Sequence, residues 1–404
     1  MAESRVRLLS VTLFAALLVL GVALLVFLPT AESVEVIAFS VLITLASLVS
    51  APTPSGQRIR LGIGPAVAAS LLLEDPLAVV AAFSLGMATT WLTIRMLGDA
   101  SGDRHGGFLA ETVALAVYGI VAVVMLDSLA EGPILEGWQG LIAVTAGGLA
   151  WFLTRAIVEA LIGLERADLS ARYLWLLALE DWAAVVSVFA AGALFGLTLP
   201  VMGLWAVPVS LMPYLFTHVA LQQYASTRVT YGQTIRALAQ IPEAAGLAPR
   251  GHSIRTADLA VAVAKEMGLH PHVVSDVDYA AAMHDVGRIT LSEPAILKAG
   301  YTDEDLARWG AQIIAEAPYL SRVAFIVEEQ HRPYRTPGVE RDPDVPIESK
   351  IIKVASAYDQ AVNEMSMPPV EALETIHQGS AYEFDPLVAR SLRRVLVHRR
   401  EVPV

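Results

Sequence analysis

Hydrophobic residues are concentrated in long continuous runs in the first part of the chain, before about Thr227. A helix needs about 20 apolar residues to cross a bilayer core of about 30 Å, and eight runs approach or exceed this length. The third run is short, so it is either a re-entrant segment or a full crossing. The pattern predicts a membrane domain over 1–223 with about eight transmembrane helices. They are expected at residues 8–29, 33–51, 59–73, 76–95, 107–126, 138–162, 173–196 and 200–221.

Beyond Thr227 the apolar residues become sparser and recur with the period of an amphipathic helix. Residues 224–242 are predicted to form a connecting helix that is interrupted by Pro242. No alternating pattern typical of strands follows, so the region 243–404 is predicted to be a soluble all-α domain. The fold class is therefore all-α: a polytopic transmembrane helix bundle followed by a soluble helical domain. Its helices are expected at about 253–267, 271–286, 303–316, 320–331, 347–363 and 384–398.

Arginines and acids alternate between successive connections of the membrane domain. Positively charged residues favour the cytoplasmic side of a membrane, which makes the third run a full crossing and places both termini in the cytoplasm. We therefore expect a multi-pass protein of a bacterial inner membrane, in contact with the lipid bilayer. The arginines on one set of connections are Arg5, Arg7, Arg58, Arg60, Arg95, Arg104, Arg166 and Arg172. The acids on the other set are Glu32, Glu35, Glu74, Asp75, Asp127, Glu131 and Glu136.

Some ionisable residues fall inside the apolar runs, where a charge is costly unless it is paired or faces water. Either these residues pair with Arg155 or lie near a membrane interface, or Glu180 and Asp181 form a ligand or ion site beside Trp182. The residues concerned are Glu111, Arg155, Glu159, Glu180, Asp181 and His218.

Charge and cysteine content narrow the classes of function. The net charge is about −7 before Thr227 and about −5 after it, so neither part is a basic nucleic-acid binder. The chain has no cysteine, so any metal must be bound by histidines and carboxylates. This composition suits a catalytic module in the cytoplasm.

Candidate chemistry lies in the soluble domain, which holds seven of the nine histidines. His252 is expected at the start of one helix, the pair His284 and Asp285 at the end of the next, and His331 at the end of a later one. Neutral imidazoles and carboxylates suit Mn, Fe, Ni, Zn or Mg, and such an ion can activate water against a phosphoryl group. The alternative is ordinary surface or capping histidines, which we expect for His270, His272, His377 and His398.

Seven short segments in order make residues 230–398 resemble HD-domain phosphohydrolases of the HD-GYP type. The segments are Gly251-His252-Ser253-Ile254-Arg255, Ala282-Met283-His284-Asp285-Val286-Gly287-Arg288-Ile289, Pro294-Ala295-Ile296-Leu297-Lys298, Glu329-Gln330-His331, Pro346-Ile347-Glu348-Ser349-Lys350-Ile351-Ile352, Ala355-Ser356-Ala357-Tyr358-Asp359 and Phe384-Asp385-Pro386. Proteins of this type hydrolyse cyclic di-GMP with two or three metal ions, and membrane-anchored examples occur in bacteria.

The resemblance implies that His252, His284, Asp285 and His331 are metal ligands. It also implies that Arg288 takes the place of a phosphate-contacting lysine, and Lys298 is a second candidate for neutralising the phosphate. The sequence departs from the pattern at several positions. Leu306, Gln330 and Ser356 stand where the resemblance expects metal ligands, Ala248 where it expects a carboxylate, and Arg335-Thr336-Pro337-Gly338 where it expects Gly-Tyr-Pro. Asp359, three residues after Ser356 on the same helical face, is a substitute ligand.

Two hypotheses follow from these residues. In the first, the chain is a membrane-bound, metal-dependent phosphohydrolase that acts on a nucleotide or cyclic dinucleotide in a signalling role. In it, His284, Asp285, Arg288 and Lys298 serve catalysis. In the second, the domain has lost hydrolysis and is a binding or regulatory module coupled to a membrane sensor. A homodimer through the connecting helix is expected in either case.

Overall fold

The chain is described by a computed structural model, and nearly all of the described residues in ordered elements are helical. The description covers residues 2–53, 58–73, 75–97, 106–129, 138–166, 170–293, 296, 298, 300–336, 338, 345–380 and 382–402. Several residues used above lie outside the described set: Glu74, Arg104, Glu131, Glu136, Pro294, Ala295, Leu297 and Pro337. The predicted all-α fold class is confirmed.

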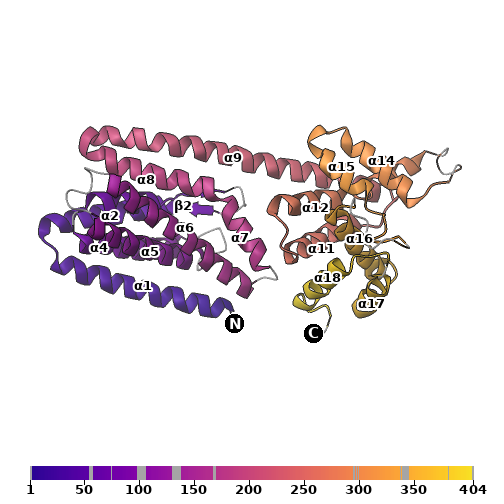
Figure 1. Cartoon of the computed structure of the whole chain (residues 1–404), viewed down its shortest axis with the longest axis horizontal. Coiled ribbons are helices and arrows are strands. Elements are labelled where there is room, and N and C mark those ends of the chain that lie inside the picture. The colour runs from indigo at the N-terminus through magenta and orange to yellow at the C-terminus, as the bar shows by residue number, and fades with distance from the viewer. Residues whose placement is uncertain are drawn as a thin grey trace. The chain divides into compact units, whose positions relative to one another are not determined.

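The chain forms two compact units (Figure 1). The N-terminal unit comprises Met1–Arg166 and Leu177–Ser226, and the C-terminal unit comprises Ala167–Leu176 and Thr227–Val404. The first unit holds helices α1 (Ala2–Phe27), α2 (Thr30–Leu48), α3 (Ile63–Leu72), α4 (Pro76–Leu97), α5 (Gly106–Leu129), α6 (Trp138–Arg166) and α8 (Trp182–Met202). Helix α7 (Ala171–Glu180) contributes residues to both units.

Five stretches of the described residues are long and apolar enough to cross a membrane: Leu8–Phe27, Thr30–Leu48, Pro76–Met96, Val144–Ile162 and Trp182–Ala244. Large apolar side chains such as Val26 and Phe27 on α1 are exposed, which suits contact with lipid rather than water. The N-terminal half is therefore that of a membrane protein. The eight-span topology and the cytoplasmic location of the termini stay predictions.

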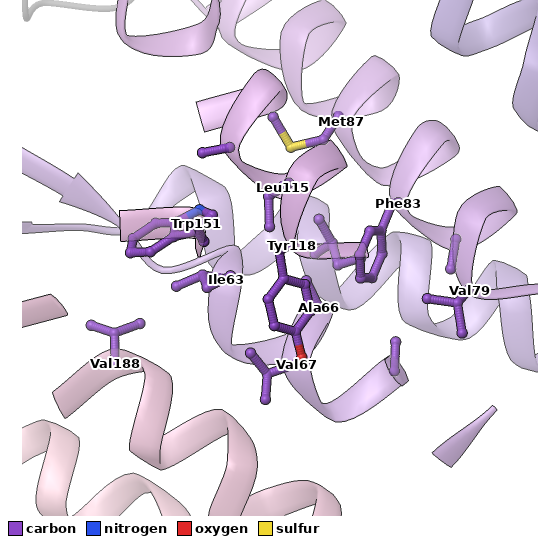
Figure 2. Close-up of a cluster of buried hydrophobic side chains, with 14 of the residues drawn as sticks. Ile63, Ala66, Val67, Val79, Phe83, Met87, Leu115, Tyr118, Trp151 and Val188 are labelled. Carbon is purple, nitrogen blue, oxygen red and sulfur yellow. The ribbon is translucent and has the colours of Figure 1, made fainter. Parts of the chain in front are cut away.

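The core of the N-terminal unit joins α3, α4, α5, α6 and α8 (Figure 2). Tyr118 of α5 lies beside Phe83 of α4, with ring centroids 6.2 Å apart, and its hydroxyl is 2.7 Å from Ser70 Oγ of α3. The hydrogen bond gives the buried phenol a polar partner, as burial requires. The sequence did not predict which faces of these uniformly apolar helices would meet.

The third apolar run differs from a simple membrane crossing. A two-stranded antiparallel ribbon, β1 (Ser50–Pro52) paired with β2 (Arg58–Arg60), precedes α3 and was not predicted. Three-residue strands carry too little alternation to be recognised in a sequence. Helix α3 has ten residues and rises about 15 Å, half of a bilayer core, so a full crossing requires its flanking residues as well.

The intramembrane acids Glu111 and Glu159 lie beside Arg155. Arg155 Nη2 is 2.9 Å from Glu159 Oε1, and Arg155 Nε is 3.8 Å from Glu111 Oε2. Of the alternatives stated above for these residues, the structure therefore shows pairing with Arg155 for Glu111 and Glu159. Helix α7 ends at Glu180 and α8 begins at Trp182, so the buried Asp181 interrupts the helical path between them.

Replacing Gly192 of α8 with alanine should destabilise the N-terminal unit. A Cβ atom there would lie 2.6 Å from Gly64 Cα and collide with the Gly64 carbonyl oxygen on α3. Because both partners are backbone, the helices must separate, at a cost of about 1–3 kcal/mol. Thermal stability of the full chain in detergent would fall. Gly232→Ala is the control, since among the described residues no atom beyond its own stretch of helix lies within 4 Å of the added Cβ. Equal stability of the two variants would contradict this packing.

The C-terminal unit is a cluster of helices in which α11 packs against α12, α16 and α18, and α15 packs against α12 and α14 (Figure 1). The predicted helices are found with ends shifted by a few residues. They are α11 (His252–Glu266), α12 (Pro271–Met283), α14 (Asp303–Ala315), α15 (Ser321–Glu328), α16 (Ile347–Asp359) and α18 (Pro386–His398). Helix α16 continues directly into the short helix η5 (Gln360–Glu364), so the helix predicted at 347–363 is found over nearly its full length. Helix α17 (Pro369–Gly379) and the short helices α10 (Ile241–Ala244), η3 (Val286–Ser292) and η4 (Pro318–Leu320) were not predicted.

The connecting helix is longer than predicted. Helix α9 runs without a break from Ala206 to Ala239, so the last apolar run and the connecting segment form one helix of 34 residues. Pro213 lies inside it. The domain boundaries at 223 and 242 stay predictions.

Candidate metal centre

Helices α11 and α12 bring His252 and His284 together from positions 32 residues apart. His252 is the first residue of α11 and is fully buried, while His284 directly follows α12. Their Nε2 atoms face each other at 3.2 Å. Asp285 directly precedes the short helix η3, and its Oδ2 atom lies 3.8 Å from His284 Nε2. Ligand atoms of these three buried residues all lie within 4.8 Å of one another.

The hydrogen bonds of the two histidines decide which ring nitrogens carry protons. His284 Nδ1 lies 2.8 Å from the carbonyl oxygen of Ala281, so this nitrogen donates a proton. His252 Nδ1 lies 2.7 Å from Asp359 Oδ2, so it also donates. In the neutral rings both Nε2 atoms then present lone pairs to the same point. Two facing lone pairs fit a shared cation, and metal-binding histidines commonly donate their other ring N–H to a carboxylate or a backbone carbonyl, as these two do.

Asp285 supplies the third donor. Its Oδ1 atom accepts a hydrogen bond of 2.7 Å from Arg288 Nε, whereas Oδ2 is buried and has no hydrogen-bond partner among the described residues. Burial favours the neutral form of the carboxyl, but electrostatic interactions with His284 and Arg288 and the hydrogen bond from Arg288 outweigh it, so the pKa of Asp285 lies below its usual range. A buried, ionised oxygen without a partner is costly, and a divalent ion would compensate it.

Asp359, a substitute ligand in the sequence, lies outside this group of three and instead supports His252. Its carboxylate accepts hydrogen bonds from His252 Nδ1, from Arg255 Nε at 2.7 Å and Nη2 at 3.0 Å, and from Asn363 Nδ2 at 2.8 Å. Burial alone would raise the pKa of Asp359, but the hydrogen bonds and electrostatic interactions of His252 and Arg255 outweigh burial and lower this pKa. The carboxylate therefore fixes the orientation of the His252 ring.

Two of the positions where the sequence departs from HD-GYP proteins, Ser356 and Gln330, lie beside the same group. Ser356 Oγ is 3.3 Å from His252 Nε2 and 3.4 Å from His284 Nε2. Gln330 Nε2 donates to the backbone carbonyl of His284 at 2.9 Å. Leu306 is buried, and its carbonyl oxygen packs so closely against Gly287 that a Cβ atom on residue 287 would collide with it. The serine is therefore placed beside both Nε2 atoms, and the glutamine steadies the backbone of one histidine. No pattern in the sequence indicates this role of Gln330.

Three further predicted site residues have distinct positions. His331 is half-buried and lies outside the group of three, and its carbonyl oxygen accepts from Lys353 Nζ at 2.9 Å. Arg288 bonds Asp285, with 29% of its side chain exposed. Lys298 is exposed. The roles predicted for these residues stay predictions.

Metal binding is expected to weaken only below about pH 6.5. Burial lowers the pKa of His284, with His252 acting in the same direction and Asp285 opposing it, and burial also lowers the pKa of His331. Since the ion binds neutral imidazole, a lowered pKa means that protons compete only at lower pH than for an exposed histidine. Titrations with Co²⁺ between about pH 8 and pH 5.5 measure this. An affinity that already declines above pH 7 would contradict it.

Comparison with known proteins assigns residues 250–361 to the HD domain family. The chain is 27% identical over 171 residues to a cyclic di-GMP phosphodiesterase of Thermotoga maritima. The aligned region covers 37% of this chain and 46% of the relative. It is 26% identical over 162 residues to the cyclic di-GMP phosphodiesterase response regulator RpfG of Xanthomonas campestris pv. campestris, covering 35% and 41%. The chain thus spans less than half the length of these relatives. No solved structure gives a significant match.

Proposed function

Since residues 250–361 form an HD domain of the phosphohydrolase family, we propose that the chain is a membrane-anchored, metal-dependent phosphohydrolase acting on a nucleotide or cyclic dinucleotide. One observation carries the proposal: two buried Nε2 lone pairs converge with an Asp285 oxygen that has no hydrogen-bond partner among the described residues. His252, His284 and Asp285 would hold the ion, with His331 as a further ligand. When bound, a divalent ion polarises a phosphoryl oxygen and lowers the pKa of water.

The other residues act on the substrate and on the ligands. Arg288 donates one N–H to Asp285. Its side chain is partly exposed, and its other guanidinium N–H groups would contact and neutralise a phosphate. Lys298 would add positive charge from an exposed position. Asp359 keeps the His252 ring in the tautomer that leaves Nε2 unprotonated.

The substrate class is supported by the two relatives, both phosphodiesterases of cyclic di-GMP. We infer a role in bacterial signalling, with the membrane unit in the inner membrane and both termini in the cytoplasm. The asymmetric distribution of arginines supports this orientation. A homodimer through α9 is part of the same proposal.

A second candidate is a binding or regulatory module that holds the nucleotide without cleaving it. Ser356 and Gln330 favour it, because a hydroxyl and an amide stand where HD-GYP proteins have metal ligands. Such a site has fewer strong ligands, which limits the number of ions it can hold.

The test is hydrolysis by the full chain, purified in detergent and loaded with Mn²⁺ or Fe²⁺. We expect cyclic dinucleotides to be converted into linear products, detected by mass spectrometry, and chelator-treated protein to be inactive. Binding of a cyclic dinucleotide without any product would support the regulatory module instead. Neither binding nor hydrolysis of any nucleotide tested would contradict both candidates.

A further inference from the structure

Glu243 links the segment that follows α9 to the first turn of α11. Its carboxylate accepts backbone hydrogen bonds from Gly251 N at 2.7 Å and from Ser253 N at 3.1 Å. These two residues flank the metal-ligand candidate His252. Gly251, the residue before the helix, has a left-handed φ of +75° and supplies no capping side chain. Glu243 therefore acts as the cap of α11 from eight residues away in the chain.

Helix α10, which carries Glu243, continues directly from α9. Ala244 N bonds the Gln240 carbonyl at 2.9 Å, and Pro242 is buried. The last turns of α9 are attached to the same unit. Arg236 Nη2 lies 3.3 Å from Asp278 Oδ2 of α12, and Tyr231 stacks on Tyr319 with ring centroids 5.0 Å apart. A shift or rotation of α9 must therefore move Glu243.

Two features make the metal centre sensitive to such a movement. The His252 ring is fixed at Nδ1 by Asp359, so its Nε2 position follows the position of the first turn of α11. In addition, α10 packs against η3, which directly follows Asp285. The short helix α10 thus contacts the chain next to two of the three ligand candidates.

We propose that Glu243 is a positioning residue for His252 and that it transmits the position of α9 to the metal centre. The proposal rests on the proposed function, because it describes regulation of that same site. Hydrogen bonds from backbone N–H groups to a carboxylate are charge-assisted and hold geometry more firmly than neutral ones. Loss of groups that orient a metal ligand commonly reduces metal affinity by about 10- to 100-fold.

The experiment compares wild type, Glu243→Gln and Asp258→Asn as full chains in detergent. Asp258 is an exposed acid on α11, so its substitution makes the same charge change on the helix without touching the cap. For Glu243→Gln we expect Co²⁺ to bind about 10-fold more weakly, the visible absorption of bound Co²⁺ to change, and the amides of residues 251–253 to exchange hydrogen faster. Asp258→Asn should match wild type.

Coupling to α9 is tested by inserting one alanine after Gly232, which turns the helix by about 100°. If Glu243 transmits the change, the insertion should weaken Co²⁺ binding in the wild-type background and have a smaller effect in the Glu243→Gln background. Equal effects in the two backgrounds would overturn the transmission. Should Glu243→Gln fail to fold, Glu243→Asp, which keeps the charge but shortens the side chain, replaces it.

Unchanged Co²⁺ affinity, absorption and amide exchange in the Glu243 variant would overturn the positioning role. A wild-type chain that binds no Co²⁺ would overturn the proposed function instead. Amide exchange needs no metal, so it would still decide whether Glu243 holds the start of α11.

Discussion

Replacing His284 with alanine is expected to abolish stoichiometric metal binding and all hydrolysis. The change removes one of the two Nε2 atoms that face each other at 3.2 Å and leaves His252 and Asp285 as the remaining pair. Loss of a direct ligand should reduce metal affinity by more than the roughly 10- to 100-fold that follows the loss of a group that only orients a ligand. The measurement is metal content by mass spectrometry, together with Co²⁺ affinity, on the full chain purified without chelator.

His272→Ala is the matched control for His284→Ala, because His272 is an exposed histidine on the preceding helix α12. The fold should survive the loss of the His284 side chain, since Gln330 bonds the backbone carbonyl of residue 284 rather than the ring. Circular dichroism of both variants checks this. Equal metal content in the two variants would show that His284 is not a ligand.

Replacing Ser356 with aspartate is expected to raise metal affinity by about 10-fold or more. The hydroxyl of Ser356 lies within 3.4 Å of both Nε2 atoms, so a carboxylate there would be placed beside the ion. HD-GYP proteins have a metal-binding aspartate at this position. Without metal, the added charge would lie near Asp285 and should destabilise the domain. The variant should therefore unfold at a lower temperature than wild type without metal, and gain more stability from Mn²⁺.

Ser356→Asn is the control for the aspartate variant, since it has nearly the same shape and no charge. If Ser356 stands where an HD-GYP centre has a metal ligand, only Ser356→Asp should bind metal more tightly than wild type. Its rate of hydrolysis should rise as well. An aspartate variant that gains no affinity would place the ion away from Ser356, and would weaken the assignment of His252 and His284 as partners in one site.

Helix positions were predictable from the sequence because their signals are local. Pro271 at the first position of α12 and Gly268 after α11, with its φ of +68°, mark helix ends whatever surrounds them. The short elements and α17 were not predicted because their signals are not local. Helix α17, the short helix α10 and the ribbon of β1 and β2 depend on packing with the rest of the chain more than on their own residues.

The candidate site was predictable as a set of residues but not as an arrangement. The pair His284 and Asp285 and the motifs around it identified the domain, and His252, His284 and Asp285 do meet. Asp359 shares a helical face with Ser356, as the three-residue spacing indicates, yet only Ser356 approaches the Nε2 atoms of both histidines. Spacing along one helix places two side chains on a face, but it does not determine which atom of a residue on another helix each one meets.

The sequence by itself determined that an apolar helical part precedes an HD domain, because hydrophobic runs, caps and short motifs are properties of neighbouring residues. Only the tertiary structure decided the tautomers of His252 and His284, the facing lone pairs between them and the link from Glu243 to the first turn of α11. Asp359 lies 107 residues from His252 in the chain. Contacts over that distance arise when α11, α12 and α16 pack together, and the packing of buried surfaces fixes which hydrogen bonds can form.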